Sequence, residues 1–394
     1  MSNQNKLIPE LRFPEFVNDK EWDEKILGNV CDITNGKANV QDHVENGKYP
    51  LFDRSEVIKS TNNFIFDCEA VIIPGEGMRF IPKYYEGKFN LHQRAYALKD
   101  FICDGKFVYY SMVFNSSLLS RKAVQSTVLS LRLPILQTFP INVPKNPTEQ
   151  QKIASCLSSL DEVITAHTDK LETLKAYKKG LMQNLFPQEG EKVPKLRFKE
   201  FEKDGEWAKD RLGDIGNPSM CKRIFKEETT SDSKNGIPFY KIGTFGKEAD
   251  SYISKVIYEE YKRKYSFPKK GDILISASGT IGRLVVYDGK PAFFQDSNIV
   301  WIDNDESKII NRLLFYAYSL LNWQTSDGGI IQRLYNADLK GMIIRYPKNK
   351  QEQQKIADTL TSLDTLIKEQ TDKIAQLKLH KKGLMQGLFP KMKN

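Results

Sequence analysis

A segment of 40 residues occurs twice in this chain, and it constrains the fold more than any other feature. Residues 148–187 and 351–390 align without a gap at a separation of 203 residues. The two copies share 25 of 40 positions, and the phrase KKGLMQ stands in both. Chance does not produce such agreement, so we expect the chain to fold as two similar halves.

Weaker similarities extend the repeat toward the N-terminus of each half. PELRFPEFVNDKEW (9–22) matches PKLRFKEFEKDGEW (194–207) at a separation of 185 residues. YPLF then matches IPFY at a separation of 188 residues. AVIIPGEG matches DILISASG, and YEGKFNLHQ matches YDGKPAFFQ, both at a separation of 202 residues. The increase predicts an insertion of about 14 residues in the second half, near residues 248–266.

This pattern predicts the order module, helix, module, helix. The expected boundaries are 1–147 for the first module, 148–187 for a central helix, 188–350 for the second module, and 351–394 for a C-terminal helix.

The repeated segment has the heptad pattern of a coiled coil. Apolar residues recur at alternating steps of four and three from Ile153 to Leu185 and from Ile356 to Leu388. Each segment predicts a helix of about 37 residues, or about 55 Å. Because the second module returns the chain between the two helices, we expect them to pair in antiparallel order. The alternative is that each helix packs only on its own module.

Four polar residues interrupt the expected seam: His167 and Lys178 in the first copy, Gln370 and Lys381 in the second. Polar residues at such positions bury poorly but pair specifically, so we interpret them as residues that fix the register. Thr148 with Gln151, and Asn349 with Glu352, are possible capping boxes at the helix starts.

Between the anchors, each half shows short β-rich runs separated by Gly, Pro and Asn, with helical stretches near 106–120 and 307–323. The fold class is therefore α/β. We expect two small mixed α/β modules joined by two long antiparallel coiled-coil helices, with an internal pseudo-two-fold repeat.

The net charge of +9 favours a polyanionic partner such as nucleic acid. The module loops carry side chains suited to the edges of bases, since Arg pairs with guanine, Gln and Asn with adenine, and Asp with cytosine. At the separation of 202, Gln93 aligns with Gln295 but Arg94 with Asp296, as expected if the modules read different sequences. The alternative is ordinary solvated loop residues. The candidate DNA-binding residues are Arg54, Arg79, Lys83, Tyr84, Tyr85, His92, Gln93, Arg94, Lys241, Ser276, Ser278, Thr280, Arg283, Gln295, Asp296, Ser297, Asn298 and Arg333.

Motifs for catalysis and for metal or cofactor binding do not stand out. The five cysteines contain no C-x-x-C, and the four histidines show no metal-ligand spacing. SGTIGR (278–283) matches neither of two phosphate-binding loop patterns, G-x-x-x-x-G-K-[ST] and G-x-G-x-x-G. Glu86-Gly87-Lys88 and Asp288-Gly289-Lys290 resemble the carboxylate and lysine of metal-dependent nucleases, but a turn between strands is the simpler interpretation. With no apolar run long enough for a membrane span and no signal-peptide core, we expect a cytoplasmic protein.

The final turns of both predicted helices are rich in large apolar residues. They would either close the seam or bind partner subunits. These candidate partner-binding residues are Leu181, Met182, Leu185, Phe186, Leu384, Met385, Leu388 and Phe389.

Three features of the sequence resemble the specificity subunits of type I restriction-modification systems. They are the paired segments at 149–187 and 352–390, the P-x-L-R-F phrases at 9–22 and 194–207, and FPINVPKNPTEQQKIA (139–154). The resemblance covers nearly the whole chain. It implies two target-recognition domains that each read half of an asymmetric bipartite DNA site, and helices that fix the spacer and carry two methyltransferase subunits.

The resemblance also implies that the chemistry lies in partner subunits: S-adenosylmethionine in the methyltransferases, ATP and Mg²⁺ in the motor-nuclease subunits, and no cofactor in this chain. Two alternatives remain open. The chain could be a stand-alone methyltransferase or nuclease, or a two-module RNA-binding scaffold.

Overall fold

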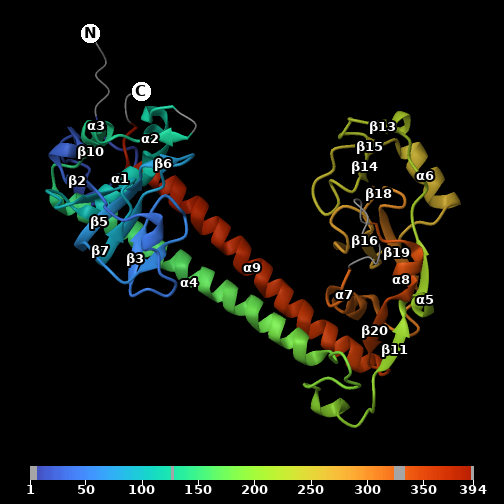
Figure 1. The fold of residues 1–394 in the computed structure, drawn as a ribbon. Helices are drawn as coiled ribbons and strands as arrows, with labels where there is room; N and C mark the ends of the chain where they lie inside the picture. The colour runs from blue at the N-terminus through green and yellow to red at the C-terminus, as the bar shows by residue number, and fades with distance from the viewer. Residues whose placement is uncertain (1–6, 126–127, 324–332, 392–394) are drawn as a thin grey trace. The chain divides into compact units, whose positions relative to one another are not determined.

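The computed structural model describes residues 7–125, 128–323 and 333–391, which fold into two compact units (Figure 1). The first unit is Met1–Lys170 with Gln370–Asn394, and the second is Leu171–Glu369. Each unit thus contains one module and parts of both long helices, α4 (Pro147–Leu185) and α9 (Lys350–Leu388). Among the described residues, no helix combines the length and the apolar character needed to cross a membrane.

The first module is built on a mixed sheet with the strand order β2-β8-β5-β7-β3-β4. β3 runs parallel to β7, and the other neighbouring strands are antiparallel. Because side chains alternate along β5, Val71 and Ile73 enter the main core with helix α1, while Ala70 and Ile72 enter a smaller core on the other face. The strands are β2 (Asp32–Asn35), β3 (Tyr49–Phe52), β4 (Lys59–Thr61), β5 (Phe66–Pro74), β7 (Lys83–Leu91) and β8 (Ala95–Lys99).

Short elements complete this module. They are β1 (Asp23–Ile26) paired with β10 (Pro140–Val143), β6 (Glu76–Gly77) paired with β9 (Leu129–Ser130), and helices α1 (Gly105–Phe114), α2 (Ser116–Lys122) and α3 (Leu133–Gln137). Asp104 caps α1 by accepting a hydrogen bond from the backbone N–H of Phe107.

The second module contains two four-stranded sheets, β12-β19-β16-β17 and β13-β15-β14-β18, and the pair β11-β20. Its strands are β11 (Ala208–Arg211), β12 (Gly216–Ser219), β13 (Thr229–Thr230), β14 (Ile237–Tyr240), β15 (Tyr252–Ile253), β16 (Ile273–Ser276), β17 (Leu284–Val286), β18 (Phe293–Phe294), β19 (Ile299–Asn304) and β20 (Ile343–Tyr346). Its helices are α5 (Leu212–Ile215), α6 (Lys255–Lys264), α7 (Asn311–Ser319) and α8 (Asn336–Gly341).

The faint repeats within the modules correspond to equivalent strands. β3 pairs in parallel with β7 in the first module, and β14 pairs in parallel with β18 in the second. These are the segments aligned at separations of 188 and 202. The region of the predicted insertion contains β15 and α6.

One prediction about turns is wrong. Gly87 lies inside β7, opposite Cys68, with φ at +122°, so Glu86-Gly87-Lys88 is part of a strand. The prediction holds for the second module, where the backbone N–H of Lys290 donates to the side chain of Asp288.

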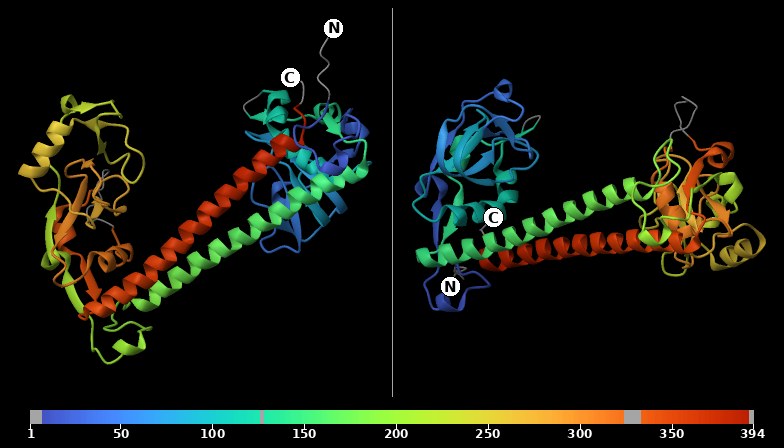
Figure 2. Two further views of the ribbon diagram at one scale, coloured as in Figure 1. Left: turned by 180° about the vertical axis from the view of Figure 1, so that it is seen from behind. Right: turned by 90° about the horizontal axis from the view of Figure 1, so that it is seen from below.

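The two long helices pair in antiparallel order in each unit. In the first unit the start of α4 lies beside the end of α9 (Figure 2). Lys381 of α9 contacts Asp161 of α4 there at 2.5 Å. In the second unit the end of α4 lies beside the start of α9, where Lys178 contacts Asp364 at 2.5 Å. Gln370 donates to the backbone oxygen of His167 at 2.7 Å. The polar seam residues are therefore paired across the helices, as predicted.

The helices also pack on the modules, which the sequence analysis had considered only as the alternative to pairing. In the first unit, Ile153 and Leu157 near the start of α4 lie in the module core, together with Leu388 near the end of α9. Leu185, Ile356 and Leu360 do the same in the second unit. Pairing between helices and packing on modules thus occur together, with seam residues near the helix ends used for the cores.

The P-x-L-R-F phrases fasten the two helices in each unit. The backbone N–H of Leu11 donates to Gly387 of α9, and that of Leu196 donates to Asn184 of α4. The next residue in each phrase is an arginine that binds a buried glutamate on the other helix.

Arg12 contacts both carboxylate oxygens of Glu149, at 2.8 and 2.7 Å. Arg197 contacts those of Glu352 at 2.8 Å. Glu352 is therefore committed to an ion pair, so the predicted capping box with Asn349 is wrong. The helix starts are instead capped by Asn146 and Asn349, whose side-chain oxygens accept from backbone N–H groups of Thr148 and Gln351.

Candidate nucleic-acid interface

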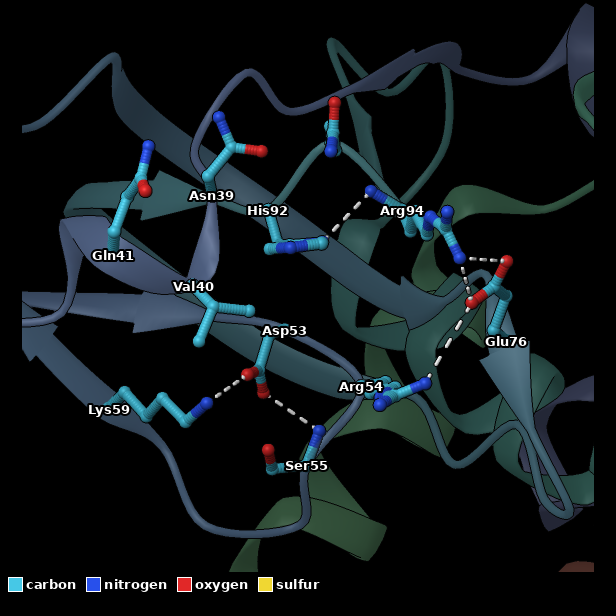
Figure 3. Close-up of a pocket in the computed structure, with 11 residues that line it drawn as sticks. Asn39, Val40, Gln41, Asp53, Arg54, Ser55, Lys59, Glu76, His92 and Arg94 are labelled. Atoms are coloured by element: carbon cyan, nitrogen blue, oxygen red, sulfur yellow. Dashed lines mark hydrogen bonds and ion pairs between the residues drawn. The ribbon is translucent and has the colours of Figure 1, made fainter.

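Six of the predicted DNA-binding residues of the first module line two neighbouring hollows of about 670 and 520 Å³. Figure 3 shows the larger hollow. Arg54 and Ser55 line both hollows. The loop after β7 also lines the larger hollow, and the region from Gly77 to Lys83 also lines the smaller one. The six residues are Arg54, Arg79, Lys83, His92, Gln93 and Arg94.

Glu76 organises the cationic side of the larger hollow. Nη1 of Arg94 lies 2.9 and 2.8 Å from the two oxygens of Glu76, and Nη1 of Arg54 lies 3.9 Å from one of them. Both arginines remain mostly exposed while the glutamate is largely covered. The carboxylate therefore holds two guanidinium groups at the mouth of the hollow, where they can attract phosphate or a base edge.

Asp53 and Lys59 form a second ion pair in the wall of the hollow, at 2.7 Å. Burial raises the pKa of Asp53, but hydrogen bonds from Lys59 and Ser55 outweigh it, so the pKa lies below its usual value. Lys83 donates to the backbone oxygen of Ser55 at 2.5 Å, and burial lowers the pKa of Lys83. These contacts fix the loop that carries Arg54.

His92 points into the same hollow with a defined tautomer when it is neutral (Figure 3). Its Nδ1 accepts a hydrogen bond from the backbone N–H of Arg94 at 3.1 Å, so the proton of the neutral ring is on Nε2. Burial lowers the pKa of His92, and the nearby Arg94 adds to the shift against an opposing effect of Asp53. The ring therefore offers one N–H donor.

Tyr84 and Tyr85 do not join the cluster. Tyr84 donates to Glu69 at 2.8 Å and packs against the main core, on the face of the sheet that carries α1. Tyr85 packs on the other face, against Phe52 and Phe89. Because neighbouring residues of a strand point to opposite faces, the two tyrosines could not have served one site.

The predicted residues of the second module lie on loops that bind each other. Ser278 donates to Asn298 at 2.8 Å, and Arg333 donates to the backbone oxygen of Ser297 at 2.9 Å. Ser297 has a φ of +51°, a strained value for a side-chain-bearing residue. These loops therefore form a rigid platform.

Several of these residues support the platform through their own hydrogen bonds. Ser276 is buried and donates to the backbone oxygen of Thr280, while Arg283 donates to that of Phe245 at 2.8 Å. Gln295 accepts from the backbone N–H of Ile242 at 2.9 Å. Lys241 is paired with Asp250 at 2.8 Å.

Asp296 has a partner that the sequence did not reveal. Nε of Arg223 lies 2.8 Å from its carboxylate, and the arginine is mostly exposed. No similarity between the halves marks Arg223, and 73 residues separate it from Asp296.

The residues predicted to bind partner subunits are mostly buried within this chain. Leu185 and Phe186 lie in the core of the second unit, with Leu181 and Met182 partly buried against it. Met385, Leu388 and Phe389 lie in the core of the first unit, with Leu384 against it. The five buried residues are therefore unavailable as a docking surface, whereas Leu181, Met182 and Leu384 remain partly exposed. Their apolar character is explained by the packing of the helix ends.

Comparison with known proteins decides the family. The sequence model of the type I restriction modification DNA specificity domain matches residues 19–176 and again residues 204–379. The chain belongs to this family.

Relatives match along nearly the whole chain. A Haemophilus influenzae protein assigned as a type I restriction enzyme specificity subunit is 37% identical, with 94% of each chain covered. The type I restriction enzyme specificity subunit MjaVIII of Methanocaldococcus jannaschii is 26% identical over 96% of this chain and 93% of its own. Among solved structures, the type I restriction-modification S subunit of M. genitalium has the same fold, with a TM-score of 0.70, 18% identity, and coverage of 98% and 100%.

Proposed function

We propose that this chain is the sequence-reading subunit of a type I restriction-modification complex and acts in the cytoplasm. Each module contacts one half of an asymmetric, bipartite site in double-stranded DNA. The observation that carries this proposal is that equivalent loops of two equivalent modules bear unlike side chains, Arg94 and Asp296. Unlike loop surfaces on one repeated scaffold are what an asymmetric site requires.

The paired helices set the distance between the half-sites. A helix of 39 residues is about 58 Å long, which corresponds to about 17 base pairs. The ion pairs of Lys178 and Lys381 hold the register of the helices, so the separation is fixed by side-chain chemistry as well as by length.

The chemistry belongs to partners in this proposal. Two methyltransferase subunits supply S-adenosylmethionine, and motor-nuclease subunits use ATP and Mg²⁺, while this chain is not catalytic. Among the described residues, no group of three or more His, Cys, Asp or Glu side chains is placed to hold a metal ion. A methyl-transfer assay on the isolated chain tests the alternative of a stand-alone methyltransferase, and RNA competition against duplex DNA tests the RNA-binding alternative.

The test is to map methylated adenines in cells that express the full chain with its methyltransferase subunits. One heptad is then deleted from both helices, residues 168–174 and 371–377, which preserves both Lys–Asp pairs. We expect the unread spacer to shorten by about 3 base pairs, since seven residues span about 10 Å, while both half-sites stay unchanged. An unchanged spacer in an assembled complex would refute the proposal that the helices set the distance between the half-sites. The absence of any bipartite motif would refute the proposed function.

A further inference from the structure

Each unit presents one strongly exposed arginine that is held by a largely covered carboxylate. In the first unit, the side chains of Arg94 and Glu76 are 61% and 17% exposed, with a contact of 2.8 Å. In the second unit, those of Arg223 and Asp296 are 60% and 16% exposed, also with a contact of 2.8 Å. The two pairs thus have the same exposure and the same separation.

The two pairs are built from different parts of the repeated fold. Arg94 lies on the loop after β7, and Glu76 lies in β6. In the second unit the loop after β18 supplies the carboxylate, Asp296, and the segment after β12 supplies Arg223. The charge at the aligned loop position is inverted, yet the outcome is the same: an arginine anchored from beneath and open to solvent.

The anchoring leaves the reading edge of each guanidinium open. Arg94 binds Glu76 through Nη1 alone, which leaves Nε and Nη2. Arg223 binds Asp296 through Nε, which leaves Nη1 and Nη2. Within the described residues neither guanidinium has another hydrogen-bond partner. Two parallel N–H donors match O6 and N7 of guanine, and a guanidinium already held in place loses less entropy when it binds.

Other arginines of the candidate interface are less suited to this role. Arg54 is 3.9 Å from Glu76, so its side chain is weakly held. Arg283 and Arg333 donate to backbone oxygens of the loops, at 2.8 and 2.9 Å, and are partly buried. A mobile cation suits a phosphate, whereas a fixed and exposed fork suits a base.

We propose that Arg94 and Arg223 each read a guanine, Arg94 in the half-site of the first module and Arg223 in that of the second, with Glu76 and Asp296 as positioning residues. This inference rests on the proposed function. It assigns the recognised base and one residue, Arg223, that the sequence did not indicate.

The test selects preferred sites from randomised duplexes with the full chain in complex with its methyltransferase subunits. Arg94→Ala should relax one guanine position in one half-site by about 10-fold to 100-fold and leave the other half-site unchanged. Arg223→Ala should do the converse. Arg94→Lys keeps the charge but loses the fork, so it should restore affinity without restoring discrimination. Glu76→Gln should weaken discrimination at the same position as Arg94→Ala, by a smaller factor.

Arg312→Ala is the matched control, because Arg312 is also half-exposed and lies 2.7 Å from a carboxylate, that of Asp358, but it joins α7 to α9. It should change no base preference. Arg94→Ala could instead lower affinity equally for all sequences, with no loss of preference at any base position. If the slope of log affinity against log salt concentration also fell by about one, Arg94 would be a phosphate contact and the inference would be overturned. If the unmodified complex selects no motif, the proposed function falls with it. If the unmodified complex selects a motif and Arg94→Lys leaves that motif fully intact, only this inference is refuted.

Discussion

The ammonium nitrogen of Lys381 in α9 lies 2.5 and 2.6 Å from the two carboxylate oxygens of Asp161 in α4. Tyr110 of α1 donates to the same carboxylate at 2.8 Å, and burial together with this bond raises the pKa of the tyrosine. One carboxylate thus joins the module helix to both long helices of the first unit.

The second unit contains the same triad with the helices exchanged. Lys178 of α4 contacts Asp364 of α9 at 2.5 Å, and Tyr316 of α7 donates to Asp364 at 2.8 Å. This explains why each copy of the repeated phrase keeps a lysine at an otherwise apolar seam position. The lysine of each copy forms an ion pair with the aspartate of the other copy.

We expect Asp161→Ala to destabilise the pairing of α4 and α9 in the first unit by about 1–3 kcal/mol, because it leaves Lys381 and Tyr110 without their acceptor. Lys381→Met should cost less than Asp161→Ala, since Asp161 is partly exposed and keeps the hydrogen bond from Tyr110, and a methionine fits the seam. Amide hydrogen exchange in residues 158–170 and 370–384 measures the change. The control is Glu172→Ala, which removes an exposed pair with Lys175 on the same helix and should change stability by less than about 0.5 kcal/mol. Unchanged protection in Asp161→Ala would contradict the triad's role.

The two buried Arg–Glu pairs allow one substitution to be compared in equivalent places. Glu149 accepts from Arg12 and also from the indole N–H of Trp22 at 3.2 Å. Trp207, the counterpart of Trp22, has a buried indole N–H with no partner in the described structure. Removing Glu149 therefore orphans one donor group more than removing Glu352.

We expect Glu352→Ala to cost about 3–5 kcal/mol, because it leaves Arg197 buried and unpaired. Glu149→Ala should cost about 1 kcal/mol more, owing to Trp22. Denaturant unfolding, followed by hydrogen exchange in each unit separately, measures both. Equal costs would show that the indole contact contributes nothing.

The pKa of His92 predicts a dependence on pH in the first unit. The folded-state pKa is lowered from the ordinary 6.5, so the unfolded chain binds the proton more readily. The stabilising contribution is therefore complete above 6.5 and is lost as pH falls through the folded-state pKa. His92→Gln should flatten the pH dependence of stability in that window.

Ring NMR signals of His92 should titrate below 6.5 in the free protein. A bound phosphate backbone nearby would favour the charged ring, so duplex DNA should raise this pKa. A titration at or above 6.5 without DNA would contradict the structure of this hollow.

Much of the architecture follows from the repeat. The separations of 188 and 202 aligned the segments that form β3 and β7 in one module with those that form β14 and β18 in the other, and the heptad pattern predicted the antiparallel helices. The parallel pairing of these strands was not predicted. These features could be predicted because each depends on a local period or on an alignment of the chain with itself.

The details that failed depend on residues distant in sequence. Arg197 binds Glu352 across 155 residues, and no local pattern distinguishes that glutamate from the acidic partner of a capping box. The sequence predicts either seam packing or partner binding for the apolar helix ends, because it does not show that the modules cover most of them. Tyr84 and Tyr85 were grouped together although strand alternation already separates them.

Most of the apolar residues at the helix ends are buried, so the proposed partner surface on the helices calls for other exposed apolar residues. Val163 of α4 and Leu366 of α9 are equivalent, 203 residues apart, and their side chains are 43% and 47% exposed. Each directly precedes a seam residue, Ile164 or Ile367, so each lies at the edge of the helix pair. Two equivalent apolar positions, one in each unit, fit two identical partners.

If the proposed methyltransferase subunits dock there, Val163→Asp and Leu366→Asp should each reduce the assembly from two bound subunits to one, and the double variant should bind none. A buried charge at the centre of an interface costs more than such a contact supplies, so the losses should be large rather than graded. Native mass spectrometry of the purified complex reads the stoichiometry directly. Ile102→Asp is the control, because Ile102 is 80% exposed but lies in the segment between β8 and α1 of the first module and not on a long helix. Retention of two subunits by the double variant would place the docking surface on another part of the chain, whereas loss in the control as well would point to a general effect of added charge.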